Sequence, residues 1–307
     1  MKKHIFFIYL ILFSSVLPLF SWHYVSFDAS MKVAQYKWAL DTTEKIVGID
    51  GYQLYFFMRS LYEQYNPAVY QQEQSTHIPK IIHQIWLGSP VPESFKDLMQ
   101  AWVDNYVSRG WEYRLWTDAD IEDFGLDNKE FYDATTNYGV KSDILKWEII
   151  YRYGGVYVDV DYEPLAPLDQ LHQYYSFYVG IQPLDTQFVQ LGAALFAAVP
   201  GHPILKHCIE TIKDDWHHHG APKKTGPVHF TKSFYALAGK NGSKDIALPP
   251  TYLYPLGCLE TKLDYETWRR NGAYAIHHWA KSWMPRNYRP QKFQDFDNRT
   301  ATLTWND

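Results

Sequence analysis

Apolar positions along this chain switch between two spacings, one typical of strands and one typical of helices. Short runs of β-branched and aromatic residues at 81–86, 111–116 and 156–160 predict buried strands. Helical spacing over 141–153 predicts a helix with Ser142 as its N-cap and a Gly-Gly pair at its end. Because such strands alternate with helices, the pattern predicts an α/β fold with a mostly parallel central sheet.

The N-terminal segment is expected to associate with a membrane. Two lysines precede an apolar run from Ile5 to Trp22. Its roughly 18 residues at about 1.5 Å each give about 27 Å, close to a hydrocarbon core of about 30 Å. A cleaved signal peptide has a similar start, but bulky aromatic residues stand where small residues would be needed for cleavage, so an uncleaved signal anchor is favoured. The predicted protein is single-pass, with its main domain lumenal or extracytoplasmic if it is of eukaryotic type.

Composition sets further bounds on organisation and partners. The sequence predicts four segments, which are a signal anchor or signal peptide (1–25), a stem with N-terminal helices (26–76), a compact main domain (77–290) and a polar C-terminal tail (291–307). The net charge of −5 at pH 7 gives no basic footprint, so no nucleic-acid partner is expected. Cys208 and Cys258 can pair or stay free, and two cysteines imply no disulfide framework.

Two carboxylates follow the predicted strand that begins at Val156. If the backbone stays extended, Asp159 and Asp161 share one face, about 6.5 Å apart along the chain. Two anions at that spacing repel one another unless a cation lies between them or one is protonated. Ligands of open α/β sheets bind at the carboxyl ends of strands, and carboxylate oxygens suit a hard divalent ion. The pair therefore fits a hard divalent ion, and such an ion can bridge the two phosphates of a nucleotide diphosphate and stabilise it as a leaving group.

The same Asp-x-Asp pattern also occurs in surface turns and in haloacid-dehalogenase-type phosphatases. The preceding run, residues 154–158, is too apolar for a surface turn, and a buried strand ending in two unpaired charges is costly. The phosphatases carry Thr or Val two residues after the second Asp, where this chain has Glu163. Both alternatives are therefore less favoured than a metal site.

Six motifs in a fixed order extend the signal beyond the carboxylate pair. They are IPKIIHQIWLG, WEYRLWTD, KSDILKWEIIYRYGGVYVDVDYEPLAPLD, VPGHPIL, TGPVHFT and YAIHHWAKSW. Together they resemble glycosyltransferase family 32, over about residues 78–284. That family includes initiating α-1,6-mannosyltransferases, inositolphosphoceramide mannosyltransferase subunits and bacterial capsule or lipopolysaccharide sugar transferases. The resemblance implies a GT-A type nucleotide-sugar-binding fold, a nucleotide-sugar donor, a Mn²⁺ or Mg²⁺ ion and retention of anomeric configuration.

The resemblance also implies roles for individual residues near the carboxylate pair. Asp161 would ligate the metal directly, and Asp159 would contact it through water or hold the donor ribose. Asp143 would accept hydrogen bonds from hydroxyls of the donor sugar. Lys146 stands where the family has arginine, so it keeps the charge but loses the bidentate fork. These four residues are the expected catalytic set.

Aromatic and histidine side chains complete the implied donor site. Trp86 matches an aromatic that stacks on the nucleotide base. The HHWAKSW segment resembles one that closes over the diphosphate, and its Trp279 and Trp283 are expected to line the donor pocket. A histidine there is a plausible third metal ligand, and we predict His278 rather than His277.

The sequence therefore predicts a metal-dependent retaining hexosyltransferase. Its expected partners are a donor (GDP-mannose first, UDP-galactose or UDP-glucose next), a glycan or glycolipid acceptor and a membrane. The alternative is a catalytically weak sugar- or nucleotide-binding protein on the same fold. Two departures from the family motivate it: Lys146 replaces the arginine, and Gly192 and Ala193 stand before the PGHP turn where many relatives carry asparagine.

Overall fold

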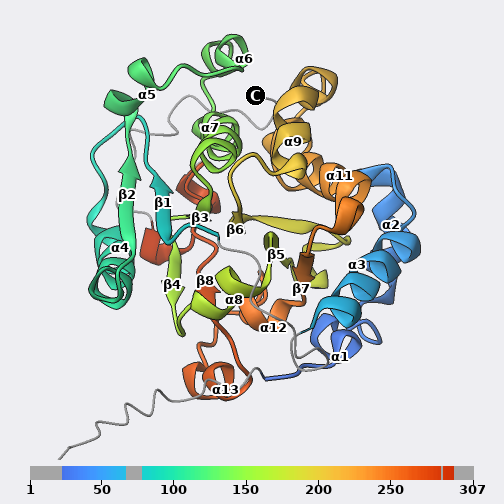
Figure 1. Cartoon of the computed structure of the whole chain (residues 1–307). Helices are drawn as coiled ribbons and strands as arrows, with labels where there is room; N and C mark the ends of the chain where they lie inside the picture. Colours follow the sequence, from blue (N-terminus) through green and yellow to red (C-terminus); the bar gives the residue numbers. More distant parts are fainter. Residues whose placement is uncertain (1–22, 67–77, 285, 294–307) are drawn as a thin grey trace, which may run out of the picture.

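The structure is a computed structural model that describes residues 23–66, 78–284 and 286–293. A six-stranded sheet forms the centre of this part of the chain (Figure 1). In spatial order its strands are β2 (Glu112–Trp116), β1 (Ile81–Ile85), β3 (Gly155–Val158), β6 (Leu191–Ala198), β5 (Phe177–Ile181) and β7 (Asp245–Leu248). A smaller antiparallel sheet consists of β4 (Tyr162–Pro164) and β8 (Ala275–His277).

All strands of the central sheet run in one direction except β6. β1 pairs in parallel with β2 and β3, and β5 pairs in parallel with β7. β6 pairs antiparallel with both β3 and β5. The predicted α/β fold with a mostly parallel sheet is therefore confirmed. The reversal at β6 has a simple cause, because residues 182–190 are too few for the crossover connection that parallel neighbours require.

Helices cover the sheet and its edges. In chain order they are α1 (Phe27–Met31), α2 (Lys37–Val47), α3 (Gly51–Tyr65), α4 (Glu93–Tyr106), α5 (Asp118–Phe124), α6 (Lys129–Asp133), α7 (Tyr138–Tyr153), α8 (Asp169–Tyr174), α9 (Pro203–Asp215), α10 (Ala221–Lys224), α11 (Pro227–Leu237), α12 (Pro250–Leu253) and α13 (Tyr265–Arg270). α7 and α11 pack against β6, α9 packs on both of these helices, and α3 packs against the edge strand β7 (Figure 1).

Helix α7 carries two predicted site residues and begins earlier than the sequence pattern indicated. Its N-cap is Asn137, whose side-chain oxygen accepts hydrogen bonds from the backbone N–H groups of Gly139 and Val140. The prediction of Ser142 as N-cap is therefore wrong, because Asn137 satisfies these backbone donors one turn earlier. Asp143 consequently lies inside the helix and is buried there.

The N-terminal helices share the hydrophobic core of the sheet. Met58 and Tyr62 of α3 are fully buried in that core, and the hydroxyl oxygens of Tyr62 and Tyr252 lie 2.9 Å apart. The anchor predicted for residues 1–25 falls, up to residue 22, outside the described residues. Among the helices that the structure describes, none has both the length and the apolar character needed to cross a bilayer.

Candidate functional site

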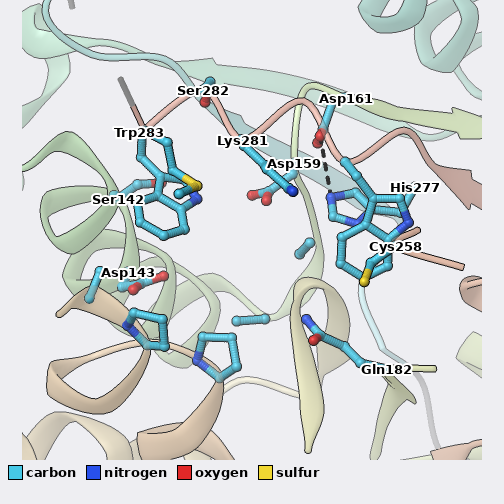
Figure 2. A pocket seen from close by; sticks show the side chains of 18 of the residues that line it. Ser142, Asp143, Asp159, Asp161, Gln182, Cys258, His277, Lys281, Ser282 and Trp283 are labelled. Carbon is cyan, nitrogen blue, oxygen red and sulfur yellow. Dashed lines mark ion pairs between the residues drawn. The ribbon is translucent and has the colours of Figure 1, made fainter. Parts of the chain in front are cut away.

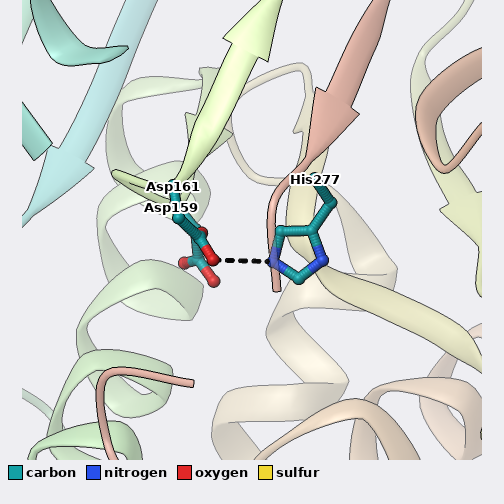
Figure 3. Close-up of side chains that lie close together, drawn as sticks. All are labelled: Asp159, Asp161 and His277. Carbon is teal, nitrogen blue, oxygen red and sulfur yellow. Dashed lines mark ion pairs between the residues drawn. The ribbon is translucent and has the colours of Figure 1, made fainter. Parts of the chain in front are cut away.

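The carboxylate pair lies in a tight turn at the end of β3. β3 ends at Val158, and the Tyr162 N–H donates to the Asp159 carbonyl oxygen over 3.1 Å. The backbone therefore does not stay extended through Asp161, the condition under which the two side chains were expected to share one face, because the chain turns at once into β4. Both carboxylates nevertheless lie beside the imidazole of His277, as Figure 3 shows.

Asp159, Asp161 and His277 form a compact cluster. One potential ligand atom from each lies within 4.8 Å of the other two, and His277 Nε2 is 3.3 Å from Asp161 Oδ2. The second ring nitrogen, His277 Nδ1, is buried without a hydrogen-bond partner. Two carboxylates and one imidazole form a donor set that suits Mn²⁺, whereas Mg²⁺ prefers oxygen alone. The residues therefore fit the divalent ion that the sequence predicted.

His278, which we predicted as the third ligand, faces a different partner. Its Nε2 is 2.9 Å from Glu163 Oε2, which also accepts a hydrogen bond from the Tyr265 hydroxyl. Adjacent residues on a strand project to opposite faces, and the register of β8 places His277 opposite Tyr162. The choice of His278 over His277 is corrected accordingly, because the strand register brings His277 and not its neighbour to the aspartates.

The two carboxylates have different electrostatic surroundings. Burial raises the pKa of Asp159 above its usual value. The charge of Lys146 offsets part of this effect, and the charge of Asp161 adds to it. Burial acts in the same direction on Asp161, but His277 and the Ala280 N–H outweigh it and lower the pKa of that carboxyl. Asp161 is thus held as the anion, the form that direct metal ligation requires.

A short segment after β8 holds Asp161 in place. The Ala280 N–H donates to Asp161 Oδ2 over 2.7 Å, and the His278 N–H donates to the Asp161 carbonyl oxygen over 3.0 Å. Trp279 and Lys281, on either side of Ala280, have φ angles of 52° and 53°. Such left-handed residues cost roughly 1 kcal/mol each, so this backbone strain is located at the functional site.

Lys146 lies between the carboxylates of α7 and those of the turn. Its Nζ is 2.8 Å from Asp143 Oδ1 and 4.0 Å from Asp159 Oδ1, and it donates to the Ala193 carbonyl oxygen over 3.0 Å. Thr225 donates its hydroxyl to the other oxygen of Asp143 over 3.0 Å. Each oxygen of Asp143 keeps a further lone pair, which can accept a hydrogen bond from a sugar hydroxyl.

The sequence reasoning missed the contribution of Tyr157. Its hydroxyl donates to Asp159 Oδ1 over 2.5 Å and lies 3.3 Å from Ser142 Oγ. The signal was present in the sequence, because residues two apart on a strand share a face. Tyr157 therefore helps to orient Asp159 from the base of the site.

The three predicted aromatic residues line the same cavity in different ways. Trp86 is only 1% exposed and packs on Phe95 with ring centroids 5.0 Å apart, so it presents no open face to a base in this conformation. Trp279 lies against His277, with ring centroids 4.4 Å apart, and Trp283 lies beside Gly139 at the start of α7. The stacking role of Trp86 stays a prediction, and it requires its covering side chains to move.

A cavity of about 430 Å³ joins these groups (Figure 2). Ser142 and Asp143 lie on one side of the view, and Gln182 and Cys258 lie on the other. Asp159 lies between the two sides. The structure therefore brings the predicted residues of α7, the β3–β4 turn and the HHWAKSW segment to one cavity, except for His278.

Comparison with known proteins agrees with this geometry. Residues 92–178 match the family model described as "Glycosyltransferase sugar-binding region containing DXD motif". The matched region includes α7 and the Asp159–Asp161 turn.

Curated relatives include inositol phosphoceramide mannosyltransferase 2 of Schizosaccharomyces pombe, 33% identical over 140 residues, which are 44% of this chain and 39% of the relative. A mannosyl phosphorylinositol ceramide synthase of Saccharomyces cerevisiae is 31% identical over 44% of this chain and 35% of its own length. The chain thus spans less than half the length of these relatives. A solved structure titled "PaToxG Glycosyltransferase" aligns over 62% of this chain and 82% of that chain, with 16% identity and a TM-score of 0.45. The chain thus contains a sugar-binding region of the DXD-containing glycosyltransferase type, and over that part of its length it is similar to mannosyltransferases.

Proposed function

We propose that this protein is a metal-dependent retaining hexosyltransferase that moves mannose from GDP-mannose to a glycolipid acceptor. The observation that carries the proposal is the convergence of Asp159, Asp161 and His277 beside Lys146 and Asp143 in one cavity. The names of the relatives, which are mannosyltransferases acting on inositol phosphoceramide, support mannose and a lipid-borne acceptor. We place the protein at a membrane on the basis of the apolar segment from Ile5 to Trp22.

The metal would be held by Asp159, Asp161 and His277, and when bound it supplies positive charge to the diphosphate leaving group. Lys146 neutralises the carboxylate on either side of it and thereby keeps both in place. Asp143 accepts hydrogen bonds from the donor sugar and fixes its orientation. Positioning and electrostatic stabilisation of this kind supply the largest part of catalysis in such sites.

The transfer step itself needs no side-chain nucleophile. The bond between the anomeric carbon and the phosphate oxygen breaks, and the electron pair leaves with the nucleoside diphosphate. The acceptor hydroxyl attacks from the same face and forms the new glycosidic bond, which retains configuration. Its proton passes to the departing phosphate oxygen.

Asp161→Asn tests this proposal. The substitution keeps the shape of the side chain but removes a metal-ligating charge, so we expect Mn²⁺-dependent hydrolysis of GDP-mannose and transfer to inositol phosphoceramide to fall roughly 10²-fold or more. Both reactions would be followed with radiolabelled donor, with and without EDTA. Asp123→Asn, at an exposed position of α5, is the matched control. Near-normal turnover by Asp161→Asn, or wild-type protein that binds donors without metal-dependent turnover, would contradict the proposal.

A thermal-shift screen identifies the donor. GDP- and UDP-sugars are tested with Mn²⁺, since a ligand that binds the native state raises Tm by mass action. GDP-mannose should give the largest shift. A larger shift with a UDP-hexose would replace mannose with that sugar and leave the reaction class unchanged.

A further inference from the structure

One wall of the cavity carries two buried oxygen atoms that have no hydrogen-bond partner. They are Asp185 Oδ1 and Gln190 Oε1, and their residues are 7% and 6% exposed. Both residues line the cavity that contains the Asp159–Asp161–His277 cluster. Buried acceptors are almost always paired, so two unpaired ones at the edge of one cavity require an explanation.

The two carboxylate oxygens of Asp185 have different surroundings, because Oδ2 accepts a backbone hydrogen bond and Oδ1 has no partner. The Leu259 N–H donates to Oδ2 over 3.2 Å, and a Cβ at Gly257 would lie only 2.5 Å from that oxygen. The neighbouring Cys258 thiol has its pKa raised to about 12, first by burial, then by the Asp185 charge and by a hydrogen bond with the Asp185 carboxylate. The turn at 257–259 therefore packs against Oδ2, whereas Oδ1 is buried with no hydrogen-bond partner.

The side-chain amide of Gln190 likewise has one polar atom with a hydrogen-bond partner and one without. Its Nε2 donates to Gln182 Oε1 over 2.7 Å, which leaves Oε1 unpaired. Gln182 lies across the cavity from Asp143 in Figure 2. The unpaired acceptors thus belong to the wall formed by residues 182–190 and 257–259, on the far side of the cavity from α7.

Helix α2 fixes this wall from behind. The Thr42 hydroxyl donates to the Gln187 carbonyl oxygen over 2.6 Å, and the fully buried Thr43 hydroxyl accepts from the Val189 N–H over 2.9 Å. The link between β5 and β6 is therefore tied to a helix rather than left as a loose loop. Acceptors presented by a fixed backbone are suited to orient a ligand.

A second cavity, of about 630 Å³, adjoins the first at the same wall. Asp185 and Leu259 line both cavities. Leu259 is 75% exposed, so at this residue the rim between the two cavities is apolar and open to solvent.

We propose that Asp185 and Gln190 form the subsite for the acceptor, which is a polyhydroxylated ring whose hydroxyl groups donate hydrogen bonds to Asp185 Oδ1 and Gln190 Oε1. This inference rests on the proposed function and assigns the second substrate to the wall facing α7. Both oxygen atoms are buried in this conformation, so the two side chains must turn before a ring hydroxyl can reach them. An anionic group is excluded from direct contact with Asp185 by charge repulsion, so a hydroxyl and not a phosphate contacts this residue.

Asp185→Asn tests the assignment, with Asp123→Asn as the matched control. The acceptor probes are myo-inositol and methyl α-mannoside as free polyols, and inositol phosphoceramide in micelles as a lipid-borne headgroup. Loss of a hydrogen bond to a charged group corresponds to a roughly ten- to hundredfold effect. We expect the ratio of transfer to donor hydrolysis to fall at least tenfold, through a higher KM for the acceptor. Preference among the probes identifies the source of the ring.

Thermal unfolding separates a substrate-binding role from a structural one. Asp185→Asn keeps an oxygen for the Leu259 N–H and removes a buried charge, so Tm should stay equal or rise. A lowered Tm with an unchanged transfer ratio overturns the inference. Gln190→Met is a second variant, for which we expect a lower transfer ratio with any probe that the wild type uses.

The outcomes distinguish the two proposals. A wild type that hydrolyses the donor in a metal-dependent way but glycosylates none of the three probes overturns the acceptor subsite alone. The same holds if Asp185→Asn and Asp123→Asn show equal ratios. A wild type without metal-dependent hydrolysis or transfer overturns the proposed function, and the subsite with it.

Discussion

At the scale of single residues, Asp161 shows which parts of the site a sequence can reveal. The Asp-x-Asp pattern after an apolar run predicted a cation site at the two carboxylates, because buried charges at a strand end need a counter-charge. The sequence could not tell which of His277 and His278 lies beside Asp161, since that depends on how β8 pairs with β4. The unpaired oxygens of Asp185 and Gln190 gave no sequence signal at all, because only the fold removes their partners.

The two adjacent histidines provide a matched pair of variants. We expect His277→Ala to weaken Mn²⁺ binding at least tenfold, because it removes the imidazole beside Asp161. His278→Ala should change Mn²⁺ affinity much less, because that ring contacts Glu163. Isothermal titration of each variant with Mn²⁺ in the presence of GDP measures the difference. Equal losses of affinity would show that His277 has no special role.

At the scale of elements, predictability depended on whether the signal was local. The strands β1, β2 and β3 were evident from short apolar runs, and the end of α7 was evident from its Gly-Gly pair. The start of α7 was misplaced because Asn137 and Ser142 are both good N-cap residues and only the tertiary structure chooses between them. The direction of β6 depends on its partners β3 and β5, which no local pattern encodes.

The contact between α9 and α11 is expected to make the fold sensitive to acid. Asp215, at the end of α9, lies 2.9 Å from His229 Nδ1 and 2.8 Å from Lys232 Nζ on α11. Burial alone would raise the pKa of Asp215, but the hydrogen bonds from His229 and Lys232 lower it to about 2. As the pH falls, the unfolded chain binds this proton first, so the stabilisation present above about pH 4 is lost towards pH 2.

In the Asp215→Asn variant, the free energy of unfolding should therefore depend less on pH under acidic conditions. Between pH 5 and pH 2 we expect the wild type to lose about 2 kcal/mol more of its free energy of unfolding than the variant does. Urea titrations at several pH values measure this difference. The neighbouring exposed Asp214, changed to asparagine, is the control. If both variants follow the wild-type acid limb, the helix contact does not depend on the Asp215 charge.

At the scale of the whole molecule, the described part of the predicted stem is integrated with the main domain. Phe27 and Met31 of α1 and Leu54 of α3 are buried in the core that also contains the strands. The polar stretch QQEQST at 71–76 predicted a boundary between the stem and the main domain, because linkers are typically polar. The packing of α3 on β7 could not be inferred, since it joins segments far apart in the chain.

Truncation tests this integration. A chain that starts at residue 23 keeps every contact described above and should unfold cooperatively. A chain that starts at residue 78 exposes the core beneath α1–α3, and each large apolar side chain in that contact is worth about 1.5–3 kcal/mol. Several such losses exceed a typical stability of about 5–15 kcal/mol, so we expect no cooperative thermal transition by near-UV circular dichroism. A sharp transition in the shorter chain would show that these helices are dispensable.

The hydrogen bond from the Ala280 N–H to Asp161 joins two residues that are made far apart in time during synthesis. Its two residues lie 119 positions apart, so the ribosome releases the aspartates long before the histidine and the backbone that hold them. A nascent chain that has just passed β3 carries both carboxylates, and of the contacts described above it has only those of Asp159 with Tyr157 and Lys146. The complete set of contacts at Asp161, with His277 and the Ala280 N–H, can therefore form only after the segment that follows β8 has been made.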